Sequence, residues 1–290
     1  QLQATTGEFN TSLGSLSMGA GVTTGDQNIA IGYTAGISIA AGSFNVLMGN
    51  AAGTNITTGT ENVAIGHQAL NTENAHGKNV AVGHTALQTL DAGADGFNVA
   101  VGNAAGKLMS TGTNNVIVGS LAGDALTTGA LNVALGTNAL GTEDTGNRNT
   151  AIGHGSLSSL NFAGNGYNTA VGYASGTALS TGAQNTLIGG NAGDSLTTGV
   201  SNVALGFAAL SASVDGDSNT AIGYAALLAY EDGDGNGHNT AVGAASQSAA
   251  TTGEFNTSLG SSSMGAGVTT GDYNVAVGYS AGLALTSGAS

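Results

Sequence analysis

The chain has 290 residues with 51 glycines and no proline, and glycine does not recur at every third position, so the composition excludes collagen. The absence of cysteine excludes disulfide bridges and thiolate metal sites. Three Lys and Arg against seventeen Asp and Glu give a formal net charge of −14, which argues against nucleic acid or an anionic membrane surface as partner. Apolar runs are far shorter than the ~20 residues that span a bilayer, so we expect no membrane insertion.

One five-residue motif recurs along the chain, and Asn62-Val63-Ala64-Ile65-Gly66 is an example of it. Most copies start 17 residues after the previous one, and a fixed short period indicates a repeat architecture. We therefore expect a single continuous repeat array over residues 1–290. The sixteen copies begin at Asn10, Asn28, Asn45, Asn62, Asn79, Asn98, Asn115, Asn132, Asn149, Asn168, Asn185, Asn202, Asn219, Asn239, Asn256 and Asn274.

Numbering each repeat from its asparagine as position 1, positions 2 to 4 form the predicted strand. Position 2 is Val, Ile or Thr, position 4 is a large aliphatic residue, and position 5 is always glycine. Side chains alternate along a strand, so positions 2 and 4 should share one side and position 3, usually alanine, the other. We expect position 4 to be buried. The alanine column is then either a surface that another chain approaches closely or a plain solvent face.

These features predict an all-β protein, a parallel β-solenoid or β-roll of about sixteen 17-residue rungs. At ~4.8 Å per rung the stack would be roughly 77 Å long. We expect the motif asparagines to stack into a ladder in which each side-chain amide bonds to the amides above and below it. The alternative is that each asparagine only fills a turn or left-handed backbone position.

A longer period of about 70 residues, or four rungs, is superimposed on the 17-residue repeat. Position 9 reads Gly-Gly-Leu-Leu in successive rungs, and every fourth rung carries extra residues. We expect these insertions to project as loops at residues 89–96, 160–166 and 230–237. Residues 1–44 also match residues 247–290 closely, which predicts that the chain is a window of a longer protein with a 246-residue tandem repeat.

The segments Asn28-Ile29-Ala30-Ile31-Gly32-Tyr33-Thr34-Ala35 and Asn149-Thr150-Ala151-Ile152-Gly153 carry a resemblance. They resemble the head repeats of trimeric autotransporter adhesins and are similar to repeats of bacteriophage tail-fibre proteins. The resemblance implies a trimeric left-handed β-roll that binds host matrix or other surfaces. The adhesin repeat is shorter than 17 residues, and neither a coiled-coil stalk nor a membrane anchor is present in this sequence.

Catalytic constellations are missing from the sequence, so we expect neither an enzyme nor an organic cofactor. Position 6 is rich in aromatic and histidine side chains, which could stack on sugars or against a neighbouring rod. The alternative is that they are scattered surface residues on a turn. The column contains Tyr33, His67, His84, His154, Tyr173, Phe207, Tyr224 and Tyr279.

A calcium site is the ion-binding candidate of the sequence. Asp232, Asp234 and Asn236 alternate with glycines as in the first half of a calcium loop, and Asp215 and Asp217 stand one rung earlier. The closing glutamate of such a loop is missing, because Gly243 stands in its place. The competing interpretation is an acidic turn in solvent.

Together these features predict a structural or adhesive subunit of an extracellular fibre or filament, built by stacking of rungs and self-association. Its main partner would be itself, as a homotrimer or filament, with surface glycans or matrix as further partners. The alternative is the shaft or receptor-binding part of a trimeric phage tail fibre, located on a virion instead of a cell surface. An ice- or glycan-binding solenoid is less well supported, because the Thr-Thr-Gly turns are irregular.

Overall fold

The computed structural model describes residues 6–19, 22–230, 237–267 and 269–287. The chain divides into two units, Gln1–Asn147 and Arg148–Ser290. The described residues of each unit contain short strands joined by turns and no helix, which confirms the prediction of an all-β fold. The prediction of one continuous array over residues 1–290 stays a prediction.

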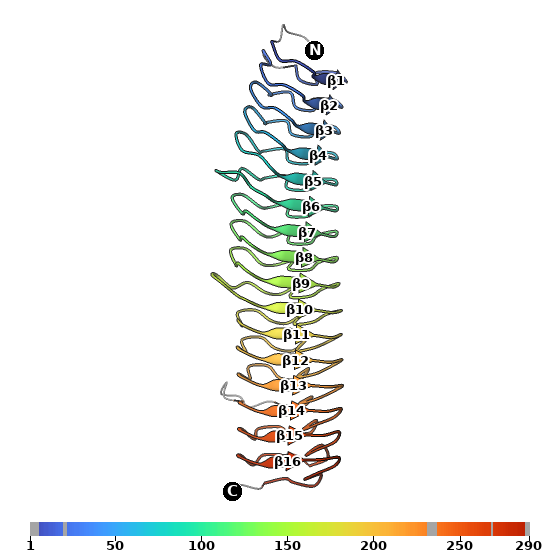
Figure 1. Ribbon diagram of the computed structural model, residues 1–290, viewed down its shortest axis with the longest axis vertical. Coiled ribbons are helices and arrows are strands. Elements are labelled where there is room, and N and C mark those ends of the chain that lie inside the picture. The colour runs from blue at the N-terminus through green and yellow to red at the C-terminus, as the bar shows by residue number, and fades with distance from the viewer. Residues whose placement is uncertain (1–5, 20–21, 231–236, 268, 288–290) are drawn as a thin grey trace. The chain divides into compact units, whose positions relative to one another are not determined.

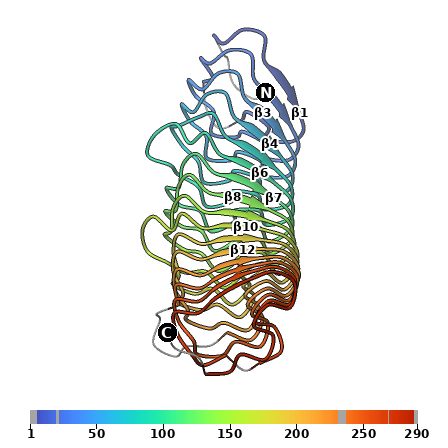
Figure 2. The ribbon, with the colours of Figure 1, turned by 60° about the horizontal axis from the view of Figure 1, so that its bottom comes forward.

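Each unit is a parallel β-solenoid in which every strand pairs with the next one along the chain. Within each unit the strands lie one above the other on one side of the coil (Figures 1 and 2). The first unit contains β1 (Thr11–Leu13), β2 (Ile29–Ile31), β3 (Val46–Met48), β4 (Val63–Ile65), β5 (Val80–Val82), β6 (Val99–Val101), β7 (Val116–Val118) and β8 (Val133–Leu135). The second contains β9 (Thr150–Ile152), β10 (Thr169–Val171), β11 (Thr186–Ile188), β12 (Val203–Leu205), β13 (Thr220–Ile222), β14 (Thr240–Val242), β15 (Thr257–Leu259) and β16 (Val275–Val277).

The register of the sheet does not change where a rung carries extra residues. Val80 pairs with Val99 although they are 19 residues apart, just as Val63 pairs with Val80 at a separation of 17. The connections that follow β5 and β9 project outward within their units, as expected from the insertions (Figure 1). Part of the third predicted loop, residues 231–236, lies outside the described residues.

The prediction that position 4 is buried is wrong. Ala64 at position 3 has no exposed surface, whereas Ile65 at position 4 is 36% exposed. The physical reason is the small bore of a 17-residue coil. In many rungs position 12 already places a large side chain in the core, as Ile39 does opposite the rung's Ala30 and Leu90 opposite Ala81, so the strand itself has room mainly for alanine.

The Gly-Gly-Leu-Leu pattern at position 9 compensates for differences in side-chain volume at position 3. Leu47 is a large residue at position 3, and a Cβ added to Gly36 or Gly53 would lie only 2.7 Å from one of its methyl groups. Leucine occurs at position 9 only in rungs with alanine at position 3, as in the rungs of Leu70 and Leu87, both of them fully buried. An alanine rung just before a large position-3 residue, such as that of Ala30, has glycine at position 9 instead. The same arrangement recurs at Ile117 and Leu187, each of which packs against two glycines at position 9. Large residues thus alternate between two facing walls of the coil.

Tight turns of the coil depend on left-handed backbone at fixed positions. In the second rung Thr34, Gly36 and Phe44 have φ values of 55°, 54° and 61°. Gly102, at position 5, has a φ of 141°, and a Cβ there would lie 2.4 Å from the carbonyl oxygen of Gly119 in the next rung. Glycine at position 5 is therefore required both by its backbone conformation and by the close approach of the next rung.

Candidate functional site

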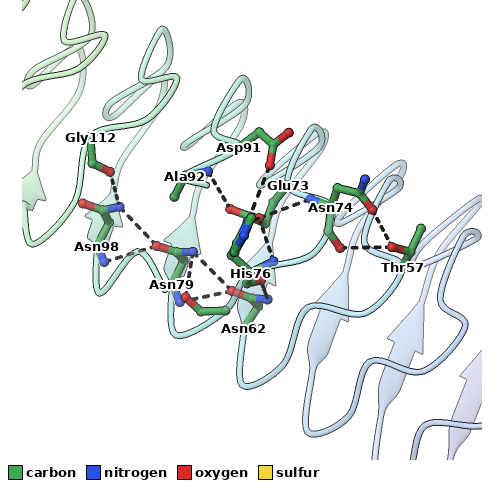
Figure 3. Close-up of polar contacts among 11 residues, drawn as sticks. Thr57, Asn62, Glu73, Asn74, His76, Asn79, Asp91, Ala92, Asn98 and Gly112 are labelled. Carbon is green, nitrogen blue, oxygen red and sulfur yellow. Dashed lines mark hydrogen bonds and ion pairs between the residues drawn. The ribbon is translucent and has the colours of Figure 1, made fainter. Parts of the chain in front are cut away.

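The motif asparagines lie inside each unit at the start of every strand and form a hydrogen-bonded ladder. The backbone N–H and the Nδ2 of Asn45 both donate to Oδ1 of Asn28 at 3.0 Å, and the same Nδ2 donates to the carbonyl of Gly59 at 2.9 Å. Figure 3 shows the contacts between rungs at Asn79 and Asn98. Nδ2 of Asn98 also donates to the carbonyl of Gly112 in its own rung, whereas Nδ2 of Asn79 donates to that of Gly77. The asparagines therefore join neighbouring rungs, and in most rungs the same side chain, as that of Asn45, also closes the turn of its own rung.

The backbone contact of this ladder is continuous within each unit. It joins Asn10, Asn28, Asn45, Asn62, Asn79, Asn98, Asn115 and Asn132 in the first unit. In the second unit it joins Asn149, Asn168, Asn185, Asn202, Asn219, Asn239, Asn256 and Asn274. None of these asparagines has a positive φ. The residue immediately before each of them does, for example Phe44 before Asn45 with a φ of 61°.

With asparagine and position 3 inside, positions 2 and 4 of every strand point outward, and we call them the outward strand face. Its position-2 column is entirely Ile and Val from β2 to β8 in the first unit, and mostly Thr in the second. Exposed members include Leu13, Ile29, Met48, Ile65, Val116 and Leu135 in the first unit, and Val203, Leu205, Leu259, Val275 and Val277 in the second. Parallel sheets are normally covered on both faces, so an apolar face in contact with water is unusual.

Charged residues are kept away from this face. Apart from Glu8, which precedes the first motif, every Asp, Glu, Lys and Arg of the sequence falls after position 9 of its rung, in the connections. One such connection carries Lys78, whose Nζ lies 2.6 Å from Oδ2 of Asp95 and 5.1 Å from the ring centre of Phe97. The hydrogen bond with Asp95 raises the pKa of Lys78 and lowers the pKa of Asp95. Both side chains are partly exposed to solvent, which screens the pair, so it adds little stability.

The position-6 side chains lie two residues beyond the end of each strand and are exposed. Three neighbouring pairs stack along the column, with ring-centre distances of 5.1 Å for His67 and His84, 5.6 Å for His154 and Tyr173, and 5.9 Å for Phe207 and Tyr224. Tyr33 and Tyr279 of the same column are also exposed. The structure thus places these residues in register, with ring faces parallel between adjacent rungs.

A second aromatic column precedes the strands and was missed by the sequence analysis. It is formed by the residue just before each motif asparagine and includes Phe44, Phe97 and Tyr167, all about half exposed. In the second unit Phe255 stacks on Tyr273 at 5.0 Å. The signal was present in the sequence, because aromatic residues recur immediately before the motif.

The predicted calcium site is only partly within the described residues. Asp232, Asp234 and Asn236 lie outside them. Asp215 and Asp217 are half-buried in the connection that follows β12, and Oδ1 of Asp217 accepts the backbone N–H of Val200 at 2.7 Å. This carboxylate thus joins two rungs, and calcium binding stays a prediction.

Comparison with known proteins found no match: no family model, no curated protein and no solved structure is significantly similar to the chain. Among the described residues, no helix has the length and apolar character needed to cross a membrane.

Proposed function

We propose that the chain is a structural subunit that self-associates through its outward strand face to build an extracellular fibre. The observation that carries the proposal is the exposed face of the parallel sheet, which is apolar in the first unit and alternates threonine with aliphatic residues along most strands of the second. Contiguous apolar surface of this kind marks an interaction site or an aggregation hazard in a soluble protein. A second copy of the chain is the occupant that we propose.

The distribution of charge supports a second copy as partner. Two chains of net charge −14 repel each other, but the acidic groups lie in the connections and not on the strands. Two outward strand faces could therefore meet without burying a charge, which would be costly. The resemblance to trimeric adhesins favours a homotrimer, and a filament is the other form of self-association that fits the same surface.

The test is a charge placed on the face. Ile65 and Leu135 are 36% and 43% exposed in the single chain, so Ile65→Lys and Leu135→Lys introduce charge without emptying the core. We expect each variant to weaken self-association at least tenfold in sedimentation velocity experiments, with an unchanged circular dichroism spectrum. Thr58→Lys, on an exposed turn of the first unit, is the matched control and should associate as the wild type does. Unchanged association of both strand variants would sink the proposal.

Electron microscopy separates the fibre from the alternative role. Long filaments of uniform width would support an extracellular or cell-surface fibre, whereas discrete trimeric rods would support the shaft of a phage tail fibre on a virion. Imaging with and without a chelator also tests whether calcium at the acidic loop contributes to assembly.

The stacked aromatic columns favour adhesion as a second role of the same subunit. Exposed, parallel rings such as Phe207 and Tyr224 offer flat apolar surfaces on which sugar rings stack. We expect Phe207→Ala with Tyr224→Ala to reduce retention on immobilised polysaccharide or matrix protein while leaving self-association intact. Equal retention of the wild type and this double variant would contradict an adhesive role of the column.

A further inference from the structure

A corner of the first unit brings together three side chains with metal-ligand chemistry. Glu73 and His76 lie in the connection from β4 to β5, and Asp91 lies in the connection that follows β5, one rung further on (Figure 3). Glu73 is fully buried, His76 is half-buried and Asp91 is exposed. One ligand atom from each lies within 4.8 Å of the other two, and among the described residues this is the one group of its kind.

The distances in this cluster suit a bound ion better than direct hydrogen bonds. Nδ1 of His76 lies 3.5 Å from Oε1 of Glu73 and 3.8 Å from Oδ1 of Asp91. This Nδ1 is buried, and it has no hydrogen-bond partner among the described residues. An ion with four ligands at ~2.1 Å in a tetrahedron separates those ligands by about 3.4 Å. The observed separations are close to that value.

The carboxylate of Glu73 is held in place before any ion arrives. Its Oε1 accepts the backbone N–H groups of Asn74 at 3.2 Å and His76 at 3.1 Å, and its Oε2 accepts that of Ala92 at 3.5 Å. Burial raises the pKa of Glu73, and the N–H groups of His76 and Ala92 offset part of that effect. A carboxylate has about four lone-pair sites, and these N–H groups use two on Oε1 and one on Oε2, so a site on Oε2 is left for a cation.

The chain repeats this corner about 70 residues later without the other two ligands. Glu143 takes the place of Glu73 and is also fully buried, and its Oε1 accepts the backbone N–H of Gly146 at 2.8 Å. Gly146 stands where the first corner has His76, and Asn161 stands where it has Asp91. The buried glutamate therefore has a structural role at both corners, while the full ligand set is assembled at the first.

From this geometry we propose that the Glu73 carboxylate, His76 Nδ1 and Asp91 Oδ1 bind one divalent transition-metal ion of the zinc class. One imidazole nitrogen with two carboxylate oxygens matches the ligands that Zn²⁺ takes, whereas Ca²⁺ prefers oxygen ligands alone. Three protein ligands leave a fourth position for water. The ion ties two successive connections together, and the site is independent of self-association because all three ligands come from a single chain.

The experiment titrates ZnCl₂ into the full, metal-stripped chain by isothermal calorimetry, with zinc content measured after dialysis. We expect one ion per chain, and binding at least tenfold weaker in His76→Gln and in Asp91→Asn. Co²⁺ in place of Zn²⁺ should give the visible absorption bands of a site with four or five ligands, and these bands should disappear in His76→Gln.

Two control variants separate the site from general effects. Glu143→Gln removes the equivalent buried carboxylate at the second corner and should leave zinc binding unchanged, whereas Glu73→Gln should weaken it. His67→Gln removes an exposed, stacked histidine of the position-6 column and should also have no effect. Wild-type chain that takes up no zinc, or zinc binding that survives both His76→Gln and Asp91→Asn in chains with unchanged circular dichroism, would overturn the proposal.

Discussion

At the scale of single residues, left-handed backbone at non-glycine positions sets how tightly this coil can turn. Ala51, at position 7 of its rung, has a φ of 57°, and its N–H donates to the carbonyl of Tyr33 in the preceding rung at 2.9 Å. The left-handed conformation costs an L-residue about 1–2 kcal/mol because its Cβ approaches the carbonyl oxygen. Each rung has several residues in this conformation. Backbone hydrogen bonds to the neighbouring rungs, such as that from Ala51 to Tyr33, hold them in it.

Removing one Cβ should therefore stabilise the coil. In ordinary backbone, Ala→Gly destabilises by about 0.5–1 kcal/mol through the entropy of the unfolded chain. We expect Ala51→Gly to be neutral or stabilising by up to about 1 kcal/mol, since it removes the left-handed strain. The exposed Ala41→Gly, at a residue without positive φ, is the control and should destabilise. Urea unfolding measures both, and equal losses of stability in the two variants would refute the strain argument.

At the scale of the element, the side chains at positions 3 and 9 share one space in the core. Where one of them is large, the other is small. Leu47 fills the space left by Gly36 and Gly53, so Leu47→Ala should cost about 2–5 kcal/mol by opening a cavity. Gly53→Leu alone should also destabilise, because its side chain would overlap Leu47.

Combining Leu47→Ala with Gly53→Leu should recover most of the loss. The double variant reproduces the Ala64 and Leu70 pair of the next rung, and Leu70 shows that leucine tolerates the left-handed backbone of position 9 with a φ of 50°. Thermal and urea unfolding of the two single variants and the double variant form a double-mutant cycle. Additive destabilisation would show that the two positions do not share one space.

Part of this fold could be predicted from the sequence alone, and the packing of the core explains why the rest could not. The 17-residue period and the β-branched strand predict the solenoid, because both depend on local pattern. The sidedness of the strand could not be derived from the pattern, since Ala64 and Ile65 alternate equally well either way. Which side of the strand faces the interior is set by the asparagine and by position 12, whose side chains occupy the inside of the coil. The Glu73, His76 and Asp91 cluster was missed for a related reason: Asp91 belongs to the next rung, and only the stacking brings it to His76.

At the scale of the whole molecule, net charge and apolar surface act against each other in self-association. Seventeen acidic groups against three basic ones oppose the approach of two chains, while the outward strand faces favour it. Salt screens charges, with a Debye length of about 30 Å at 0.01 M and about 10 Å at 0.1 M, and does not weaken apolar contact at these concentrations. Raising the salt concentration should therefore strengthen association.

We expect the association constant to rise by at least tenfold between 0.01 M and 0.15 M NaCl, measured by sedimentation velocity at constant protein concentration. EDTA in both buffers removes divalent cations, so that neither the proposed zinc site nor the acidic loop contributes. Ile65→Lys should associate weakly at both salt concentrations, because its charge stands on the face itself. Association that falls with salt would mean that ion pairs hold the chains together, and the contact surface would then lie on the charged connections instead of the strands.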